Sequence, residues 1–369
     1  MSPAQDVLVV GAGIVGAAVA RELALRGLSV AVVDSQPPGL GATSAGMGHL
    51  VVLDGSEAEF QLCRRSMELW DPLLPDLPSD CQARRPGTFW VAVGEDELAL
   101  VARKASYYLQ HGVEAEALDA KSALEAEPAL RRDVSGALFV PGDAVIYPPA
   151  AARWLLENGP EGKVSVLKGR VIEIGEGRAR MAGGEELSFR WGVLAGGCAN
   201  DLMPSLPLEP KKGHLVITDS YPGLIGRQLV EIGYGAGTRE GKATTVAFNA
   251  QPRSTGQILI GSSRQFVGDD RSLDRKALGL MLQRACEYLP ILAELEVIRT
   301  WVGFRAATPD HLPIVSEAPN LSGWWVAAGH EGLGITTSLA SGELIADLML
   351  GTGPTLDPAP YSVRRFAGG

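Results

Sequence analysis

Cysteine is scarce in this chain of 369 residues, and its four cysteines lie far apart in the sequence. None of them belongs to a CxxC pair, which argues against a zinc site, an iron–sulfur cluster and a disulfide framework. The pattern instead predicts reduced, buried thiols at Cys63, Cys81, Cys198 and Cys286. We therefore expect a functional site without a bound metal.

Long apolar runs are also missing, since none reaches the roughly 18 residues that a membrane-spanning helix needs. We expect no signal peptide, because an apolar strand begins within a few residues of Met1. Both observations predict a cytoplasmic protein. Basic residues are outnumbered by acidic ones, and the formal net charge of −10 argues against nucleic acid and anionic membranes as partners.

One strong motif is present near the N-terminus, a set of three glycines after an apolar run. Residues 7–10 are valine or leucine, as in a buried parallel strand, and Gly11, Gly13 and Gly16 follow them. In such a turn the first glycine bends the chain, the second admits a pyrophosphate, and the third allows close packing of helix and strand. A helix over residues 14–26 would then direct its free N–H groups at the phosphates.

A second apolar strand, residues 30–33, ends at Asp34. An acidic side chain at this point accepts hydrogen bonds from a ribose in dinucleotide-binding proteins. Strand, turn, helix and acid together predict a dinucleotide site, and a glycine-rich turn without a ligand is the alternative interpretation.

The rest of the chain alternates between segments typical of this nucleotide fold and segments typical of an antiparallel sheet. Residues 37–49 are rich in glycine and small side chains, and we expect them to run extended along a flat cofactor. Residues 136–148 predict a hairpin, and the Gly- and Pro-rich segment from residue 351 onward is expected to fray. Further strands are predicted over residues 88–93, 164–167, 171–174, 191–197, 214–218, 244–248, 257–261, 300–305 and 323–329, and further helices over residues 56–74, 95–110, 149–157, 273–289 and 336–350.

A series of motifs, taken in order, resembles the FAD-dependent D-amino acid oxidase type of oxidoreductase, which includes glycine oxidase, sarcosine oxidase and D-amino acid dehydrogenases. Residues 46–51 and 329–332 look most like D-hydroxyproline dehydrogenases and the related opine-oxidising subunits. The turn 329–335 has no role in a plain NAD-dependent dehydrogenase, so the resemblance favours FAD over NAD. Besides the N-terminal glycines, the motifs are residues 41–46, 127–128, 193–197, 303–305, 309–314 and 328–335.

The resemblance implies an α/β fold in which an FAD-binding, Rossmann-like domain of the glutathione reductase type is interleaved with an antiparallel-sheet substrate domain. Residues 306–308 contain no cysteine where the sarcosine oxidases attach their flavin, so we expect noncovalent FAD. The predicted FAD-binding domain comprises residues 1–80, 150–205 and 300–369, and the predicted substrate domain comprises residues 81–149 and 206–299.

The N-terminal motif and the resemblance together give a set of candidate cofactor-binding residues. The turn before the last helix can direct N–H groups and a helix dipole at the flavin carbonyl, where negative charge develops on reduction. By resemblance, Val171 matches a position whose backbone meets the adenine. The set is Gly11, Gly13, Ile14, Val15, Gly16, Asp34, Ser35, Ala42, Thr43, Ser44, Gly46, Met47, Gly48, Val171, Ala195, Gly196, Gly197, Gly303, Gly332, Leu333, Gly334, Ile335 and Thr336.

Four residues are candidates for the reaction itself. Arg305 matches the carboxylate-binding arginine of glycine oxidase, and a guanidinium pairs with a carboxylate through two hydrogen bonds. Gly332 replaces a second arginine of that enzyme, and Asn249 stands near its expected tyrosine, so Asn249 and Glu331 are candidate contacts to a different or larger substrate. Solvated loop residues are the alternative interpretation of both. His49 could tune the flavin or accept a proton from a substrate ammonium, or else be structural.

Together with these residues, the resemblance implies FAD-dependent oxidation of the C–N bond of a D-amino or cyclic imino acid, by hydride transfer to the flavin. The preferred substrates are cis-4-hydroxy-D-proline and D-proline. One alternative is a glycine or sarcosine oxidase. The other is the flavin subunit of a hetero-oligomeric opine or amino acid dehydrogenase. The partners considered are the small-molecule substrate, a second copy of the chain, and electron-transfer subunits with a peripheral link to a respiratory chain.

Overall fold

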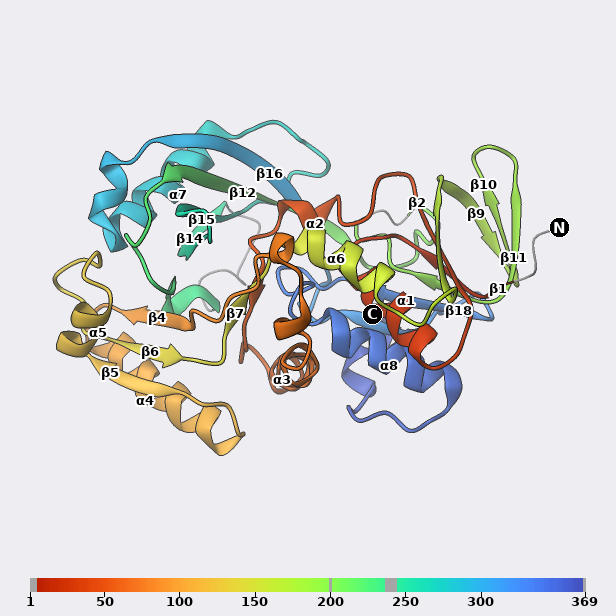
Figure 1. Cartoon of the computed structure of the whole chain (residues 1–369), viewed down its shortest axis with the longest axis horizontal. Helices are drawn as coiled ribbons and strands as arrows, with labels where there is room; N and C mark the ends of the chain where they lie inside the picture. Colours follow the sequence, from red (N-terminus) through yellow and green to blue (C-terminus); the bar gives the residue numbers. More distant parts are fainter. Residues whose placement is uncertain (1–4, 199–200, 236–243, 368–369) are drawn as a thin grey trace.

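Two eight-stranded sheets dominate the computed structural model, which describes residues 5–198, 201–235 and 244–367 (Figure 1). The first sheet has the order β17-β18-β11-β1-β2-β8, and its pairs are parallel except at the β17 edge. Two further strands, β9 and β10, join it through β11. The strands are β1 (Gln5–Val10), β2 (Val30–Asp34), β8 (Val164–Lys168), β9 (Val171–Gly175), β10 (Arg178–Met181), β11 (Glu186–Leu194), β17 (Ile314–Glu317) and β18 (Trp324–Ala328).

Both faces of the first sheet are covered, as a parallel sheet requires. Val7 and Val9 face a core that includes helix α1 (Ile14–Leu25), whereas Leu8 faces a second core shared with β9 and β10. Small residues let the helices pack closely, since a Cβ at Gly342 would lie 2.9 Å from the carbonyl oxygen of Ala18. The helices of this half are α1, α3 (Glu57–Trp70), α6 (Pro148–Glu157) and α8 (Ser338–Leu350).

The second sheet lies at the other end of the molecule, with α2 (Ala42–Ala45) and α6 between the two sheets (Figure 1). Its order is β16-β12-β15-β14-β13-β4-β6-β5, and every pair is antiparallel except β13–β4. Helix α7 (Arg275–Tyr288) packs on it through Tyr288, whose ring stacks on Phe248. The strands are β4 (Thr88–Ala92), β5 (Glu116–Asp119), β6 (Gly136–Val140), β12 (Glu209–Ser220), β13 (Gln228–Glu231), β14 (Thr245–Pro252), β15 (Gln257–Arg264) and β16 (Val297–Ala307), accompanied by helices α4 (Glu95–Gln110) and α5 (Ala120–Ala126).

The structure corrects three expectations about local structure. The predicted hairpin over residues 136–148 is wrong, because β6 pairs with β4 and β5, whereas β7 (Ala144–Val145) pairs with β3 (His49–Leu50). Residues 37–49 are not extended throughout, because they contain α2. The segment after residue 351 is packed, as far as it is described: the Tyr361 side chain is 1% exposed and its hydroxyl donates to the Ala58 carbonyl at 2.7 Å.

The mixed α/β fold is as predicted, with a nucleotide-type parallel sheet and a mostly antiparallel second sheet. The division into two interleaved domains stays a prediction. Its boundary at residue 300 falls inside β16, which pairs with β12 of the second sheet along its length. Within the described ranges, no helix is both long enough and apolar enough to cross a membrane.

Candidate active site

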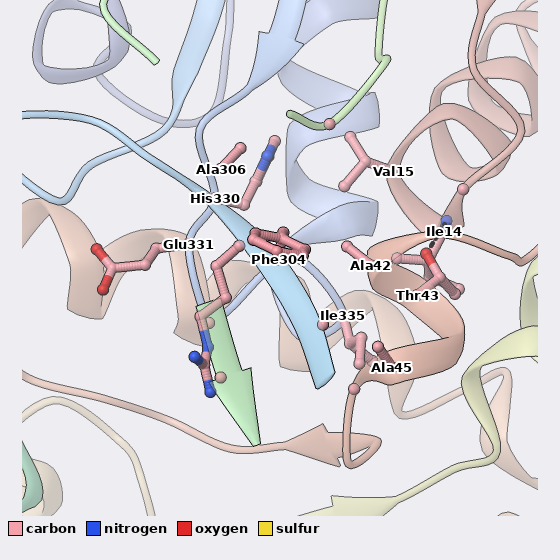
Figure 2. A pocket seen from close by; sticks show the side chains of 18 of the residues that line it. Ile14, Val15, Ala42, Thr43, Ala45, Phe304, Ala306, His330, Glu331 and Ile335 are labelled. Carbon is pink, nitrogen blue, oxygen red and sulfur yellow. Dashed lines mark hydrogen bonds between the residues drawn. The ribbon is translucent and has the colours of Figure 1, made fainter. Parts of the chain in front are cut away.

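A cavity lies where the turn between β1 and α1 meets α2, β16 and the turn after β18 (Figure 2). All four candidate catalytic residues line it: His49, Asn249, Arg305 and Glu331. Most of the candidate cofactor residues line it too, namely Gly11, Gly13, Ile14, Val15, Asp34, Ala42, Thr43, Gly46, Met47, Gly48, Ala195, Gly196, Gly197, Gly303, Gly332, Gly334 and Ile335.

A second, smaller cavity adjoins the first, and His49, Asn249 and Glu331 line both. Leu333 and Thr336, which were expected to bind the cofactor, line only the second cavity. Four other candidate cofactor residues line neither of the two cavities: Gly16, Ser35, Ser44 and Val171.

The side of the first cavity formed by the β1–α1 turn, Asp34 and residues 42–48 is called the nucleotide wall below. Its glycines have no room for side chains: a Cβ at Gly11, where φ is +113°, would lie 2.4 Å from the Ala195 carbonyl oxygen. A Cβ at Gly16 would lie 2.0 Å from the Gly11 carbonyl oxygen. Gly16 therefore packs against the turn at Gly11 and does not line the cavity.

Hydrogen bonds fix the polar groups of the nucleotide wall. The Asp34 carboxylate accepts the Ala12 N–H at 2.8 Å and the Gln36 N–H at 2.9 Å, and each of its oxygens keeps a further lone pair. The Thr43 hydroxyl accepts the Ile14 N–H at 3.0 Å (Figure 2). Among the described residues of its first turn, α1 has no acidic side chain. An electropositive helix start beside a fixed carboxylate fits a dinucleotide with its pyrophosphate and ribose.

A second set of lining residues, called the substrate wall below, comprises His49, Asn249, Arg305 and Glu331. β16 brings Arg305 into place by passing very close to α2. A Cβ at Gly303 would lie 2.4 Å from the Cβ of Ala45, and the Trp301 indole donates to the Ala45 carbonyl at 3.4 Å. The close approach therefore depends on glycine at position 303.

The Arg305 guanidinium occupies space that two glycines leave open. Its Nη1 donates to the Ser263 carbonyl at 3.1 Å, and a Cβ at Gly213 would lie 2.3 Å from the same nitrogen. A Cβ at Gly332 would lie 3.8 Å from the Arg305 Nε. The position at which the resemblance expects a second arginine thus adjoins Arg305. Sequence reasoning missed Gly213, for which only its position after two lysines gave a signal.

The Glu331 carboxylate is held by two groups of the chain itself. Lys211 Nζ lies 2.6 Å from one oxygen and His311 Nδ1 lies 2.7 Å from the other. Burial alone would raise the pKa of Glu331, but the hydrogen bond from His311 and the charge of Lys211 lower it to about 2. Figure 2 shows the carboxylate turned away from Phe304 and His330. This arrangement favours a supporting role for Glu331 over the direct substrate contact expected from the sequence.

Two histidines face the cavities as neutral groups. Burial lowers the pKa of His330 to about 4, and its Nε2 lies 2.9 Å from the Ser341 hydroxyl. Burial also lowers the pKa of His49, whose Nδ1 contacts the Gln228 amide oxygen. The Nε2 of His49 and the Oδ1 of Asn249 are both buried without a hydrogen-bond partner in the described structure.

A dinucleotide-binding turn and a half-buried arginine line one cavity, an arrangement typical of an enzyme that holds a dinucleotide cofactor beside its substrate. The chain belongs to the DAO family of FAD dependent oxidoreductases, whose sequence pattern matches residues 6–348. Its cofactor is therefore FAD, and the NAD-dependent alternative is wrong.

Two relatives and one solved structure align with almost the whole chain. Glycine oxidase of Pseudomonas aeruginosa is 29% identical over 97% of this chain and 98% of that protein. A subunit of the opine oxidase of Rhizobium meliloti is 27% identical over 98% of this chain and 97% of that protein. The crystal structure of glycine oxidase from Geobacillus kaustophilus superposes with a TM-score of 0.87 at 28% identity, covering 99% of both chains.

Proposed function

We propose that this protein oxidises the C–N bond of a D-amino or cyclic imino acid, with cis-4-hydroxy-D-proline and D-proline as preferred substrates. The observation that carries the proposal is the composition of the substrate wall. A cation, Arg305, lines the same cavity as two buried acceptors without partners in the described structure, His49 Nε2 and Asn249 Oδ1. A carboxylate beside an amine pairs with the arginine and satisfies both acceptors.

When bound in this cavity, FAD supplies the acceptor for a hydride from the substrate's α-carbon. Arg305 binds the carboxylate and so orients that carbon. His49 takes a proton from the substrate ammonium at Nε2, because the amine must be neutral before the α-hydrogen leaves as hydride. Asn249 accepts the remaining N–H. The cofactor is held by the candidate residues of the nucleotide wall, with Asp34 on the ribose.

Position 332, where the resemblance expects a second arginine, favours a substrate bulkier than glycine. Glycine at this position leaves space beside Arg305 that an arginine would fill. A five-membered ring with its nitrogen in the ring fits a site that offers one cation and two acceptors. Glycine and sarcosine stay in the test as competing substrates.

A second candidate substrate is an opine, in which a secondary amine carries two carboxylates. The observation that favours it is Arg264, a largely buried residue that lines the smaller cavity together with His49 and Asn249. An arginine in each of the two cavities that share these acceptors matches an amine that carries two carboxylates. Relatives that are named as subunits, such as the one from the opine oxidase of Rhizobium meliloti, support a role in a hetero-oligomer for this candidate.

The test is anaerobic reduction of the flavin, which is monitored as the loss of its visible absorbance. The panel comprises D-proline, cis-4-hydroxy-D-proline, other D-amino acids, glycine, sarcosine and opines. We expect the two proline derivatives to reduce the flavin fastest, with Arg264→Met changing their rates little. A preference for opines that Arg264→Met abolishes would replace the first candidate with the second. If dithionite reduces the flavin and no compound of the panel does, both candidates are wrong.

A further inference from the structure

A chain of buried side chains extends from His49 away from the cavity, and the reaction described above does not use it. The first member is Gln228 on β13, whose amide oxygen contacts Nδ1 of His49. The amide nitrogen of Gln228 donates to the Thr88 hydroxyl at 3.1 Å and to the Ala144 carbonyl at 3.3 Å. Both amide protons are therefore in use.

This orientation of Gln228 decides where the proton of His49 lies. An amide oxygen can only accept, so Nδ1 must carry the proton and Nε2 must present a lone pair. The Gln251 amide nitrogen also lies 3.3 Å from Nδ1 and can donate to it only in the opposite tautomer, so the two glutamines compete for this nitrogen. Nε2 is buried without a partner in the described part of the chain, and His49 lines both cavities.

Thr88 and Asp143 extend the chain. Thr88 is fully buried and accepts from Gln228, so its hydroxyl proton is available to the Asp143 carboxyl, whose pKa Thr88 lowers. One Asp143 oxygen accepts the Val52 N–H at 3.4 Å, and the other is buried without a partner in the described structure.

We propose that Asp143, Thr88 and Gln228 form a buried relay that fixes the tautomer of His49, so that its Nε2 faces the substrate as a proton acceptor. The three are positioning residues, since they act on the reaction only through His49. The proposal rests on the proposed function for the role of His49 as a base, but the tautomer itself does not depend on any substrate.

Asp143 makes the relay sensitive to pH. Burial raises the pKa of Asp143 to about 7, while Thr88, Val52 and the charge of Arg85 act in the opposite direction. A neutral Asp143 is a weaker hydrogen-bond acceptor than the ionised carboxylate. The Thr88 hydroxyl is therefore held most firmly above pH 7, where Asp143 is ionised. The other titratable groups around Asp143 are Asp54 on the loop before α3, Glu59 and Cys63 on α3, and Tyr108 on α4.

The test measures the tautomer directly, by ¹⁵N NMR of the holoenzyme labelled at histidine, with His49→Asn used to assign the signal. We expect Nδ1 to be protonated in the wild type above pH 7. Thr88→Val should remove this preference and slow flavin reduction about 10- to 100-fold, which lies within the contribution of a general base. Thr88→Ser keeps the hydroxyl and should restore both. Asp143→Asn keeps an acceptor and should remove only the pH dependence near 7.

Thr218→Val is the matched control, because Thr218 is a buried threonine of the same sheet whose hydroxyl accepts the Ile258 N–H at 3.0 Å. It should leave the His49 signals unchanged. A wild type protonated at Nε2, or a Thr88→Val variant with unchanged His49 signals, would overturn the relay. Failure of every candidate substrate would instead overturn the proposed function and leave the NMR result standing.

Discussion

The two walls of the cavity are built from different chemical groups, backbone in the nucleotide wall and polar side chains in the substrate wall. The nucleotide wall consists largely of glycines and backbone N–H groups, and Asp34 is the acidic side chain that it contributes. The substrate wall consists of side chains, with Arg305, Glu331, His49 and Asn249 partly or fully buried. A backbone-built wall is specified by a short sequence, whereas a wall of buried polar side chains needs partners from several distant strands. Changes in the two walls should therefore have different consequences.

The largest expected effect is complete release of the flavin when the protein is denatured. Acid precipitation of the purified yellow protein should release all of its flavin into solution as intact FAD, because residues 306–308 contain no cysteine where the resemblance places a covalent attachment. The absorbance and chromatographic mobility of the released flavin give the answer. Flavin that stays with the precipitate would show that a side chain holds it covalently.

Arg305→Ala should damage the substrate wall and spare the nucleotide wall. Loss of one partner of a buried, charged pair costs about 2–5 kcal/mol, so kcat/KM on the best substrate should fall by about two to three orders of magnitude. Arg305→Lys should recover part of the loss, because an ammonium lacks the planar fork of the guanidinium. The flavin spectrum of both variants should match that of the wild type. Near-normal turnover by Arg305→Ala would move the carboxylate site elsewhere.

Glu331→Gln should reduce stability, because it leaves Lys211, which is 2% exposed, without its charge partner. The expected loss at pH 7 is about 3 kcal/mol in the free energy of unfolding, measured with denaturant. The pKa of Glu331 is lowered from 4.5 to about 2, so its stabilisation is present above pH 4.5 and is lost as the pH falls toward 2. The difference between wild type and variant should therefore shrink over that range.

A double variant provides the control for Glu331. In Lys211→Met with Glu331→Gln, no uncompensated lysine is left in the wall, and much of the lost stability should return. A double variant that is no more stable than Glu331→Gln alone would mean that the Lys211 charge is not the source of the loss.

Asp34→Ala should weaken FAD binding and leave the fold intact. The substitution removes an acceptor for the ribose, and one charged hydrogen bond is worth roughly 1.5–3 kcal/mol, or about 10- to 150-fold in the dissociation constant. Fluorescence titration of the apoprotein with FAD measures the change. Arg305→Ala is the matched control, since it should bind FAD normally. An unchanged affinity for FAD in Asp34→Ala would contradict the assignment of Asp34.

The same contrast explains how much could be predicted from the sequence. The β1–turn–α1 unit and Asp34 were predicted because their contacts are local. The pairing of β7 with β3 and the packing of Tyr361 against α3 were missed, because both depend on segments far away in the chain. The hairpin prediction over residues 136–148 rested on two neighbouring strand-like segments, and closeness in sequence does not fix which strands they pair with.

On the substrate wall, the sequence predicted which residues meet but not what they contact. Arg305 and Asn249 were brought together as expected, yet Lys211 as the partner of Glu331 and Gln228 as the partner of His49 had no local signal. The sequence spacing between these partners exceeds 100 residues in each pair. Such pairs follow from the register of the second sheet, which the sequence pattern does not specify.

The most direct test of the central claim is binding of pyrrole-2-carboxylate, a planar analogue of proline with no hydrogen on its α-carbon. It cannot be oxidised at that carbon, so it should perturb the flavin absorbance in a saturable way without bleaching it. We expect a dissociation constant about 100-fold weaker in Arg305→Ala, and pyrrole without the carboxylate should bind poorly to both proteins. Equal binding of the analogue to wild type and Arg305→Ala would contradict a carboxylate site on Arg305 beside the flavin.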